Sequence, residues 1–216
     1  MNTGKSILVD TSKCTACRGC QIACKQWNGL PATKTKQVGT YQNPQDLSAQ
    51  TWKLVRFAEG RKEDKKPYWY FFADSCRHCV EPPCKMAAES TLKGAVLQDE
   101  KTGAVLFTEA TKKLKLKEIQ ESCPYNIPRA DPKTKRMFKC TMCVDRQTGD
   151  MPPACVQTCP TAMTYGDRQK ILDLAAKRVE ELKKTFPKAR AIDADSVRVI
   201  FIVTDDPAKY HKHAAS

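Results

Sequence analysis

Apolar and polar residues alternate along short segments of this chain, which is the pattern of half-buried β-strands. Residues Thr51 to Phe57 alternate in this way, and the aromatic-rich run Tyr68 to Phe72 follows after a charged stretch, Glu59 to Pro67. Two strand-like runs on either side of a polar stretch predict a β-hairpin, with the charged residues at its tip.

A second predicted hairpin lies further along the chain, and a polar loop precedes the first. Ala95 to Leu97 and Ala104 to Phe107 flank a turn-rich stretch, Asp99 to Gly103, and we expect this hairpin to serve packing alone. The segment Lys25 to Asn43 is polar and is punctuated by glycine and proline, so it predicts an extended loop.

One long segment has helical rather than strand periodicity. Asp167 to Thr185 is predicted as an amphipathic helix, with Asp167 as its N-cap and Pro187 beyond its end. Such an apolar stripe is typical of a helix that packs on its own domain rather than on a partner. The stripe consists of Ile171, Leu172, Leu174, Ala175, Val179 and Leu182.

Twelve cysteines fall into four groups along the chain. The groups are Cys14-x2-Cys17-x2-Cys20-x3-Cys24, Cys76-x2-Cys79-x4-Cys84, Cys123 alone, and Cys140-x2-Cys143-x11-Cys155-x3-Cys159. A 4Fe-4S cluster takes four thiolates, and in two-cluster ferredoxins the first three cysteines of a run bind one cluster while the fourth binds the other. These spacings predict that the cysteines bind iron-sulfur clusters, which carry electrons.

This exchange of the fourth cysteine between two runs is called the exchange rule below. Applied to this chain, it uses every cysteine and predicts three 4Fe-4S clusters. The first cluster takes Cys14, Cys17, Cys20 and Cys159. The second takes Cys24, Cys140, Cys143 and Cys155. The third takes the remaining set, Cys76, Cys79, Cys84 and Cys123.

A fourth cluster would complete the middle part of the chain, but all four of its ligands are replaced. The expected cysteine positions hold Ala88, Lys113, Leu116 and Ile119. The neighbouring set is complete, so the pattern indicates loss of one whole cluster from a four-cluster ancestor rather than scattered loss of cysteines.

Structural disulfides and zinc are the alternative uses of so many cysteines. Disulfide scaffolds are mostly small secreted domains without a large core, whereas this chain is long and 41% hydrophobic. The group Cys140 to Cys159 could by itself bind zinc, but four cysteines between Cys14 and Cys24 match ferredoxins better. No C-x2-C pair is followed by histidine, which excludes covalent c-type haem.

The chain is basic, with a formal net charge of +13. Twelve thiolates and three oxidised cluster cores would bring the loaded chain to about +7. The lysines and arginines are spread along the sequence, no nucleic-acid-binding motif is present, and only 7% of residues are aromatic, so we expect no nucleic-acid partner. A basic surface of this kind suits an acidic subunit or redox partner.

The sequence predicts neither an export signal nor a membrane span. Met1 to Asp10 has too short an apolar run for a signal peptide, and the chain has no Arg-Arg pair. The longest apolar runs, Tyr68 to Ala73 and Val199 to Val203, are far shorter than a bilayer-spanning helix.

No set of residues predicts catalysis within this chain. It has three histidines, no phosphate-binding glycine loop and no nucleophile motif. His211 and His213 are predicted to be solvated in a polar tail. His78, between two cysteines, is predicted as a solvated spacer, although a hydrogen bond from it to cluster sulfur would raise the reduction potential.

The cysteine groups and their neighbours resemble those of a known family over nearly the whole chain. The family is the iron-sulfur beta subunits of molybdenum or tungsten bis-pterin oxidoreductases, and the chain is most similar to the small subunits of the soluble formate dehydrogenases of sulfate-reducing bacteria. The matching segments are Cys14 to Trp27, Cys76 to Cys84, Cys123 to Arg129, Lys139 to Arg146 and Pro153 to Thr161.

The resemblance implies an electron-transfer subunit without a catalytic site. Electrons from formate oxidation at a Mo/W bis-pterin centre in a large alpha subunit would pass through three 4Fe-4S clusters to an external acceptor, such as a soluble cytochrome c. Membrane-bound members have a fourth cluster and a C-terminal transmembrane helix, and this chain departs from both features. Related complexes are exported on a twin-arginine signal of the large subunit, so we expect a periplasmic location, with a cytoplasmic one as the alternative.

Two other functions remain open at this point. The chain could serve another bis-pterin oxidoreductase that acts on a sulfur, nitrogen or arsenic oxyanion, or it could be a free polyferredoxin. A free ferredoxin is usually acidic and compact, whereas this chain is basic and has long segments without cysteine, Lys25 to Ser75 and Lys85 to Ser122. Such segments suit a subunit interface.

The predicted fold class is α+β, with two ferredoxin-like modules, the second inserted in the first, and with added β-hairpins and a C-terminal helix. Residues 1–59 and 136–216 would form the module that holds two clusters, and residues 60–135 the inserted module that holds one. Short strands at Ser6 to Val9 and Ala162 to Tyr165 would flank the cysteine loops of the first module.

Overall fold

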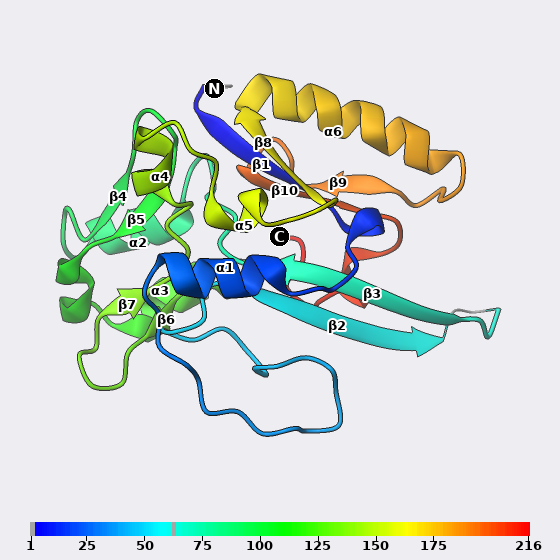
Figure 1. Cartoon of the computed structure of the whole chain (residues 1–216). Coiled ribbons are helices and arrows are strands. Elements are labelled where there is room, and N and C mark those ends of the chain that lie inside the picture. Colours follow the sequence, from blue (N-terminus) through cyan, green and yellow to red (C-terminus); the bar gives the residue numbers. More distant parts are fainter. Residues whose placement is uncertain (1–2, 62–63) are drawn as a thin grey trace.

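A four-stranded sheet joins the two ends of the chain in the computed structural model, which describes residues 3–61 and 64–216 (Figure 1). The strands lie in the order β8-β1-β10-β9. β1 pairs in parallel with β10 and antiparallel with β8. Their bounds are β1 Lys5–Asp10, β8 Met163–Asp167, β9 Arg190–Ile192 and β10 Val199–Val203. The predicted strands at residues 6–9 and 162–165 are therefore neighbours in this sheet.

Both faces of the sheet are covered, which explains the continuous apolar run in β10. Ile200 and Ile202 belong to the apolar cluster under the long helix α6, Arg168–Lys183. Phe201 faces the other way and stacks on Phe72, with ring centroids 4.2 Å apart. All five residues of β10 are buried. A strand covered on both faces has no need for polar alternation.

Helix α6 confirms the predicted amphipathic helix. Its buried residues are Ile171, Ala175, Val179 and Leu182, with Arg168 in the first turn. Asp167 occupies the N-cap position, but its carboxylate makes no capping hydrogen bond and instead accepts one from Lys5 Nζ at 2.7 Å. The predicted apolar stripe thus packs on the sheet of its own domain, except that Leu174 is exposed.

The first predicted hairpin is present, and its strands are longer than the alternation suggested. β2 spans Leu54–Arg61 and β3 spans Pro67–Asp74, in antiparallel register from Leu54 opposite Asp74 to Arg61 opposite Pro67. Part of the predicted charged tip, residues 62 and 63, lies outside the described residues. Stacked aromatic side chains such as Tyr68 and Tyr70 support the outer half of the hairpin.

Short elements complete the fold around the cysteine loops. The second predicted hairpin is confirmed as β4 and β5, and residues 28–53 form a long loop with an isolated bridge between Ser48 and Thr51. The remaining strands are β4 Val96–Gln98, β5 Val105–Phe107, β6 Arg129–Ala130 and β7 Met137–Phe138. The short helices are α1 Gly19–Trp27, α2 Pro83–Glu89, α3 Leu116–Glu121, α4 Val144–Thr148 and α5 Ala154–Gln157, with 3-10 turns at Thr11–Lys13, Glu109–Lys113 and Pro207–Lys209.

The place where a fourth cluster would lie is filled by packed apolar side chains. Ala88 on α2 and Ile119 on α3 are buried in one apolar cluster, and Leu116 packs against it. Lys113 is exposed to solvent. The four replaced cysteine positions thus belong to a small hydrophobic core and its rim.

The C-terminal tail was predicted to be solvated, and for His211 that prediction is wrong. Tyr210 is buried and stacks on Tyr70 with ring centroids 4.4 Å apart, and Ala214 is also buried. These contacts draw the tail against the β2–β3 hairpin. The His211 side chain is only 12% exposed, and burial lowers its pKa to about 4. Across residues 3–61 and 64–216, none of the helices has the length and apolar character needed to cross a membrane.

Candidate iron-sulfur centres

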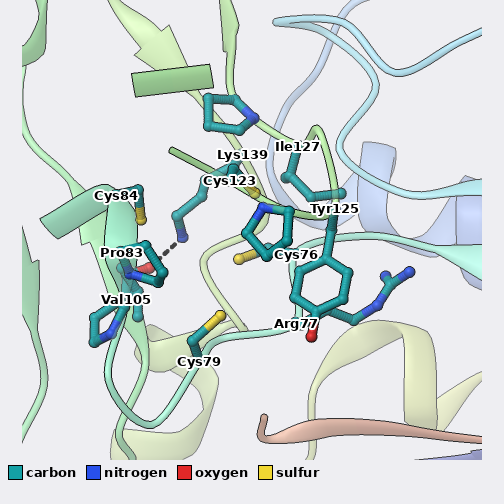
Figure 2. Close-up of a pocket in the computed structure, with 13 residues that line it drawn as sticks. Cys76, Arg77, Cys79, Pro83, Cys84, Val105, Cys123, Tyr125, Ile127 and Lys139 are labelled. Atoms are coloured by element: carbon teal, nitrogen blue, oxygen red, sulfur yellow. Dashed lines mark hydrogen bonds between the residues drawn. The ribbon is translucent and has the colours of Figure 1, made fainter. Parts of the chain in front are cut away.

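Four cysteines from three segments line one cavity in the middle part of the chain. Cys76 and Cys79 lie in the loop after β3, Cys84 in the first turn of α2, and Cys123 just after α3. Figure 2 shows the four sulfur atoms directed toward the same space. This is the set predicted for the third cluster.

A second cavity lies between α1 and the C-terminal cysteine loops. Cys24 on α1 and Cys155 on α5 line it together with Cys140 and Cys143. These residues come from opposite ends of the chain, as the exchange rule requires. They are the set predicted for the second cluster.

The set predicted for the first cluster gathers at the N-terminal end of α1. Cys14 lies close enough to Cys17 and Cys159 for their charges to raise its pKa, although burial is the larger cause. Cys20 has Cys14 and Cys159 among its charged neighbours. Thr161 Oγ1 donates a hydrogen bond to the Lys13 carbonyl at 2.8 Å, which joins the two loops. Cys17 is the exposed member.

Three of the four C-x2-C loops, those that begin at Cys14, Cys76 and Cys140, share one backbone conformation. In each loop the residue two positions after the first cysteine has a positive φ, which is 54° at Ala16, 48° at His78 and 58° at Met142. This turn aims the N–H of that residue at the preceding sulfur, at 3.3 Å for both Cys76 and Cys140. Ala16 donates to Cys14 in the same way. Such N–H groups stabilise thiolate ligands.

Burial strongly disfavours free thiolates at these sites. It raises the pKa of Cys20, Cys79, Cys84 and Cys140 to about 12, and that of Cys143 to about 11. The free thiols are therefore protonated at neutral pH, and metal loading releases protons. None of the twelve cysteines forms a disulfide.

The arrangement of the sulfur donors fits a cluster of several metal atoms. A single zinc ion needs its sulfur ligands about 2.3 Å from one point. The donors of the second and third sets surround cavities, and soft thiolates are the usual ligands of iron-sulfur clusters.

His78 was predicted to be a solvated spacer, and that prediction is wrong. The residue is 0% exposed, and its Nδ1 accepts a hydrogen bond from the Val105 N–H at 3.0 Å. Nδ1 acts as acceptor, so the proton of the neutral ring lies on Nε2. Burial, followed by the charge of Lys139, lowers the pKa of His78 well below its usual value. The ring is therefore neutral and buried against β5, between two cysteines of the third set.

Sequence reasoning overlooked two buried lysines among the cysteines. Lys53 lines the cavity of the second cysteine set and is 4% exposed. Lys139 lines the cavity of the third set and is 5% exposed. Lys139 directly precedes Cys140, which was a usable signal. Lys53 lies far from any cysteine in sequence, and only the β2–β3 pairing brings it to the site.

The comparisons with known proteins agree with this chemistry. The family model described as a 4Fe-4S dicluster domain matches residues 67–168, which contain eight of the twelve cysteines. The matched segment includes the whole third set and the four cysteines between Cys140 and Cys159. The chain therefore contains a 4Fe-4S domain within a mixed α and β fold.

Several curated proteins match almost the whole chain. Formate dehydrogenase 2 subunit beta (cytochrome c-553) of Nitratidesulfovibrio vulgaris is 50% identical over 97% of this chain and 98% of its own length. The formate dehydrogenase subunit beta of Megalodesulfovibrio gigas is 46% identical over 98% and 99%. This chain belongs to the family of formate dehydrogenase beta subunits. Members of this family are iron-sulfur electron-transfer subunits, not catalytic ones.

The family also includes longer members. The formate dehydrogenase-O iron-sulfur subunit of Escherichia coli is 37% identical over 94% of this chain, but the match covers only 69% of that subunit. The beta subunits of similar length to this chain come from sulfate-reducing bacteria, as the cysteine segments had indicated.

Proposed function

We propose that this beta subunit carries electrons from formate oxidation, at a Mo/W bis-pterin centre in a large alpha subunit, through three 4Fe-4S clusters to an external acceptor. The observation that carries the proposal is the gathering of all twelve cysteines into three sets of four. Each cluster, when bound, would accept and release one electron. The chain supplies thiolate ligands, backbone N–H donors and buried walls that exclude water.

The proposed ligand sets are those of the exchange rule. They are Cys14, Cys17, Cys20 and Cys159 for the first cluster, Cys24, Cys140, Cys143 and Cys155 for the second, and Cys76, Cys79, Cys84 and Cys123 for the third. Cys20 has Cys155 of the second set among its charged neighbours, and Cys140 has Cys76 of the third. These charge interactions between neighbouring sets support a linear order with the second set in the middle.

The proposed domain organisation is two ferredoxin-like modules, one inserted in the other. Residues 1–59 and 136–216 would hold the first two clusters, and residues 60–135 the third. The four-stranded sheet built from both ends of the chain supports the composite first module.

We propose that the third cluster passes electrons to a soluble cytochrome c or a similar carrier. It is the last set in the linear order, and the replacement of a fourth set by an apolar core leaves it without a successor in this chain. One relative has cytochrome c-553 in its name, which supports this class of acceptor.

The proposed location is the periplasm, where the chain would arrive folded with an alpha subunit that carries the twin-arginine signal. Fractionation of the native host tests this location. The proposal requires the chain in the periplasmic fraction, and detection in the spheroplast lysate alone contradicts it.

Anaerobic affinity purification of the tagged chain from its native host tests the proposed function. We expect a large subunit to co-purify and the complex to reduce a viologen dye when formate is added. A large subunit with intact clusters but no formate activity would contradict formate as the electron source. Absence of a large subunit would contradict the proposed complex.

A further inference from the structure

Lys53 is a buried ammonium group whose hydrogen-bond partners among the described residues are neutral. It directly precedes β2, opposite the end of β3. Its Nζ donates to the Ala73 carbonyl at 3.2 Å and to Ser75 Oγ at 3.3 Å. A charge buried on neutral partners alone costs several kcal/mol. Its retention therefore requires negative charge nearby.

The negative charge around Lys53 comes from cysteines of two different sets. Lys53 lines the cavity shared by Cys24, Cys140 and Cys155, and its charge also acts to lower the pKa of Cys20, although burial raises that pKa overall. Cys20 belongs to the first set, and the other three belong to the second. Lys53 thus lies in the gap between the first and second cluster sites.

Lys139 occupies the equivalent place in the next gap. It directly precedes Cys140 of the second set, and it lines the cavity of the third set. Its Nζ donates to the Cys140 carbonyl at 3.0 Å and to the Val105 carbonyl. Figure 2 shows this ammonium group reaching in among the four sulfur atoms. Its charge acts to lower the pKa of Cys84, although burial raises that pKa overall.

We propose that Lys53 and Lys139 are fixed positive charges placed in the two gaps between cluster sites, where they raise the reduction potentials of the clusters on either side. The inference rests on the proposed function, because it requires clusters at these sites. Reduction adds an electron to a group that already carries about −2 when ligated by four thiolates. A nearby buried cation stabilises that added charge, and solvent screens it little.

A charge between two clusters also has a consequence for electron flow. It acts on both neighbours at once, so it raises their potentials together and opposes a steep energy step between them. A surface lysine has no such effect, because water and ions screen it. Lys184, an exposed residue at the end of α6, provides that comparison.

The test is a potentiometric titration of the purified complex, followed by electron paramagnetic resonance of the reduced clusters. Wild type is compared with Lys53→Met, Lys139→Met and the control Lys184→Met. Methionine keeps a similar length and removes the charge. A Cys123→Ser complex identifies the third-cluster signal as the one that disappears. Iron analysis of every sample separates a shifted cluster from a lost one.

We expect Lys53→Met to lower the midpoint potentials of the two signals that survive in Cys123→Ser, and to leave the third unchanged. Lys139→Met lowers the potentials of the second and third clusters. Lys184→Met matches wild type. Lys53→Arg keeps the charge and stays closer to wild type than Lys53→Met. The shifts persist at high salt, since the charges are buried.

Full iron content with unchanged potentials in both methionine variants would overturn the inference and leave the proposed function intact. If both methionine variants lose iron, Lys53→Gln and Lys139→Gln replace them, and iron loss there too would also overturn it, because the lysines would then serve assembly. A wild-type complex with fewer than three clusters would instead contradict the proposed function.

Discussion

At the residue scale, a network of buried ion pairs centred on Asp74 lies beside the third cysteine set. Asp74, whose side chain is 1% exposed, accepts hydrogen bonds from Arg56 at 2.7 Å and from Arg77 at 3.0 Å. Arg77 lies between Cys76 and Cys79, and its guanidinium packs on aromatic rings, including that of Tyr125 at 5.0 Å. Asp74 therefore connects the end of the hairpin to the cysteine loop.

Removal of that carboxylate leaves two arginines without their buried partner. We predict that Asp74→Ala lowers the free energy of unfolding by about 3–5 kcal/mol, and that the third cluster is lost first on heating. Thermal unfolding of the cluster-loaded chain, followed by iron release, measures the effect. Asp173→Ala on the exposed face of α6 is the matched control. Equal stability of the two variants would contradict the role given to Asp74.

The cysteine groups could be read from the sequence because cluster ligation imposes short, regular spacings. The surroundings of the cysteines could not. His78 has the same local sequence whether it is solvated or buried, and its contact with Val105 depends on tertiary structure. Lys53 is distant from every cysteine in sequence, so its place beside Cys20 and Cys155 depends on how the hairpin docks.

At the scale of elements, helices α2 and α3 hold an apolar core where a fourth cluster would lie. Ile119 is 2% exposed and belongs to the same cluster as Ala88 and Val96. Apolar packing thus supports Cys84 and Cys123, which lie at one end of these two helices. The replaced positions have become part of the scaffold of the third cysteine set.

This core can be tested by a large-to-small substitution. We predict that Ile119→Ala lowers the free energy of unfolding by about 2–5 kcal/mol, because it leaves a cavity among α2, α3 and β4. Leu97→Ala on β4 is the control, since Leu97 is 47% exposed and its loss costs little. Calorimetry of the loaded chain compares them. A control as damaging as Ile119→Ala would show that this core is not packed as described.

Elements with a strong local pattern were predictable, and elements fixed by the clusters were not. The β2–β3 hairpin and α6 follow from alternation and helical periodicity. The Asp167 side chain failed as a cap because Lys5 of the neighbouring strand competes for it. The elements β6, β7 and α5, with two to four residues each, carry too little pattern to be seen.

At the scale of the whole molecule, the chain folds so that its two ends and its middle each contribute to a line of cysteine sets. The sheet β8-β1-β10-β9 brings both ends together, and the β2–β3 hairpin leads directly into the third set. An isolated bridge between Cys79 and Val197 ties that set to the start of β10. The proposed relay relies on this arrangement.

The direction of the relay predicts a split between two assays in a Cys123→Ser complex. We expect formate-dependent dye reduction at the alpha subunit to continue, while reduction of the cytochrome acceptor falls to background. The iron content should fall by about four atoms per chain. Exposed Ser90→Ala is the control and should leave both assays unchanged. Wild-type cytochrome reduction by a complex that lacks the third cluster would contradict the proposed exit.

The most direct test of the central claim is a spin count on the anaerobic native complex before and after formate is added. The account predicts that formate alone reduces clusters of this chain, and that full chemical reduction reveals three 4Fe-4S clusters in addition to any in the alpha subunit. Complexes that carry the Cys123→Ser substitution should have one fewer. Fewer than three clusters in wild type, or clusters that formate cannot reduce, would contradict the account.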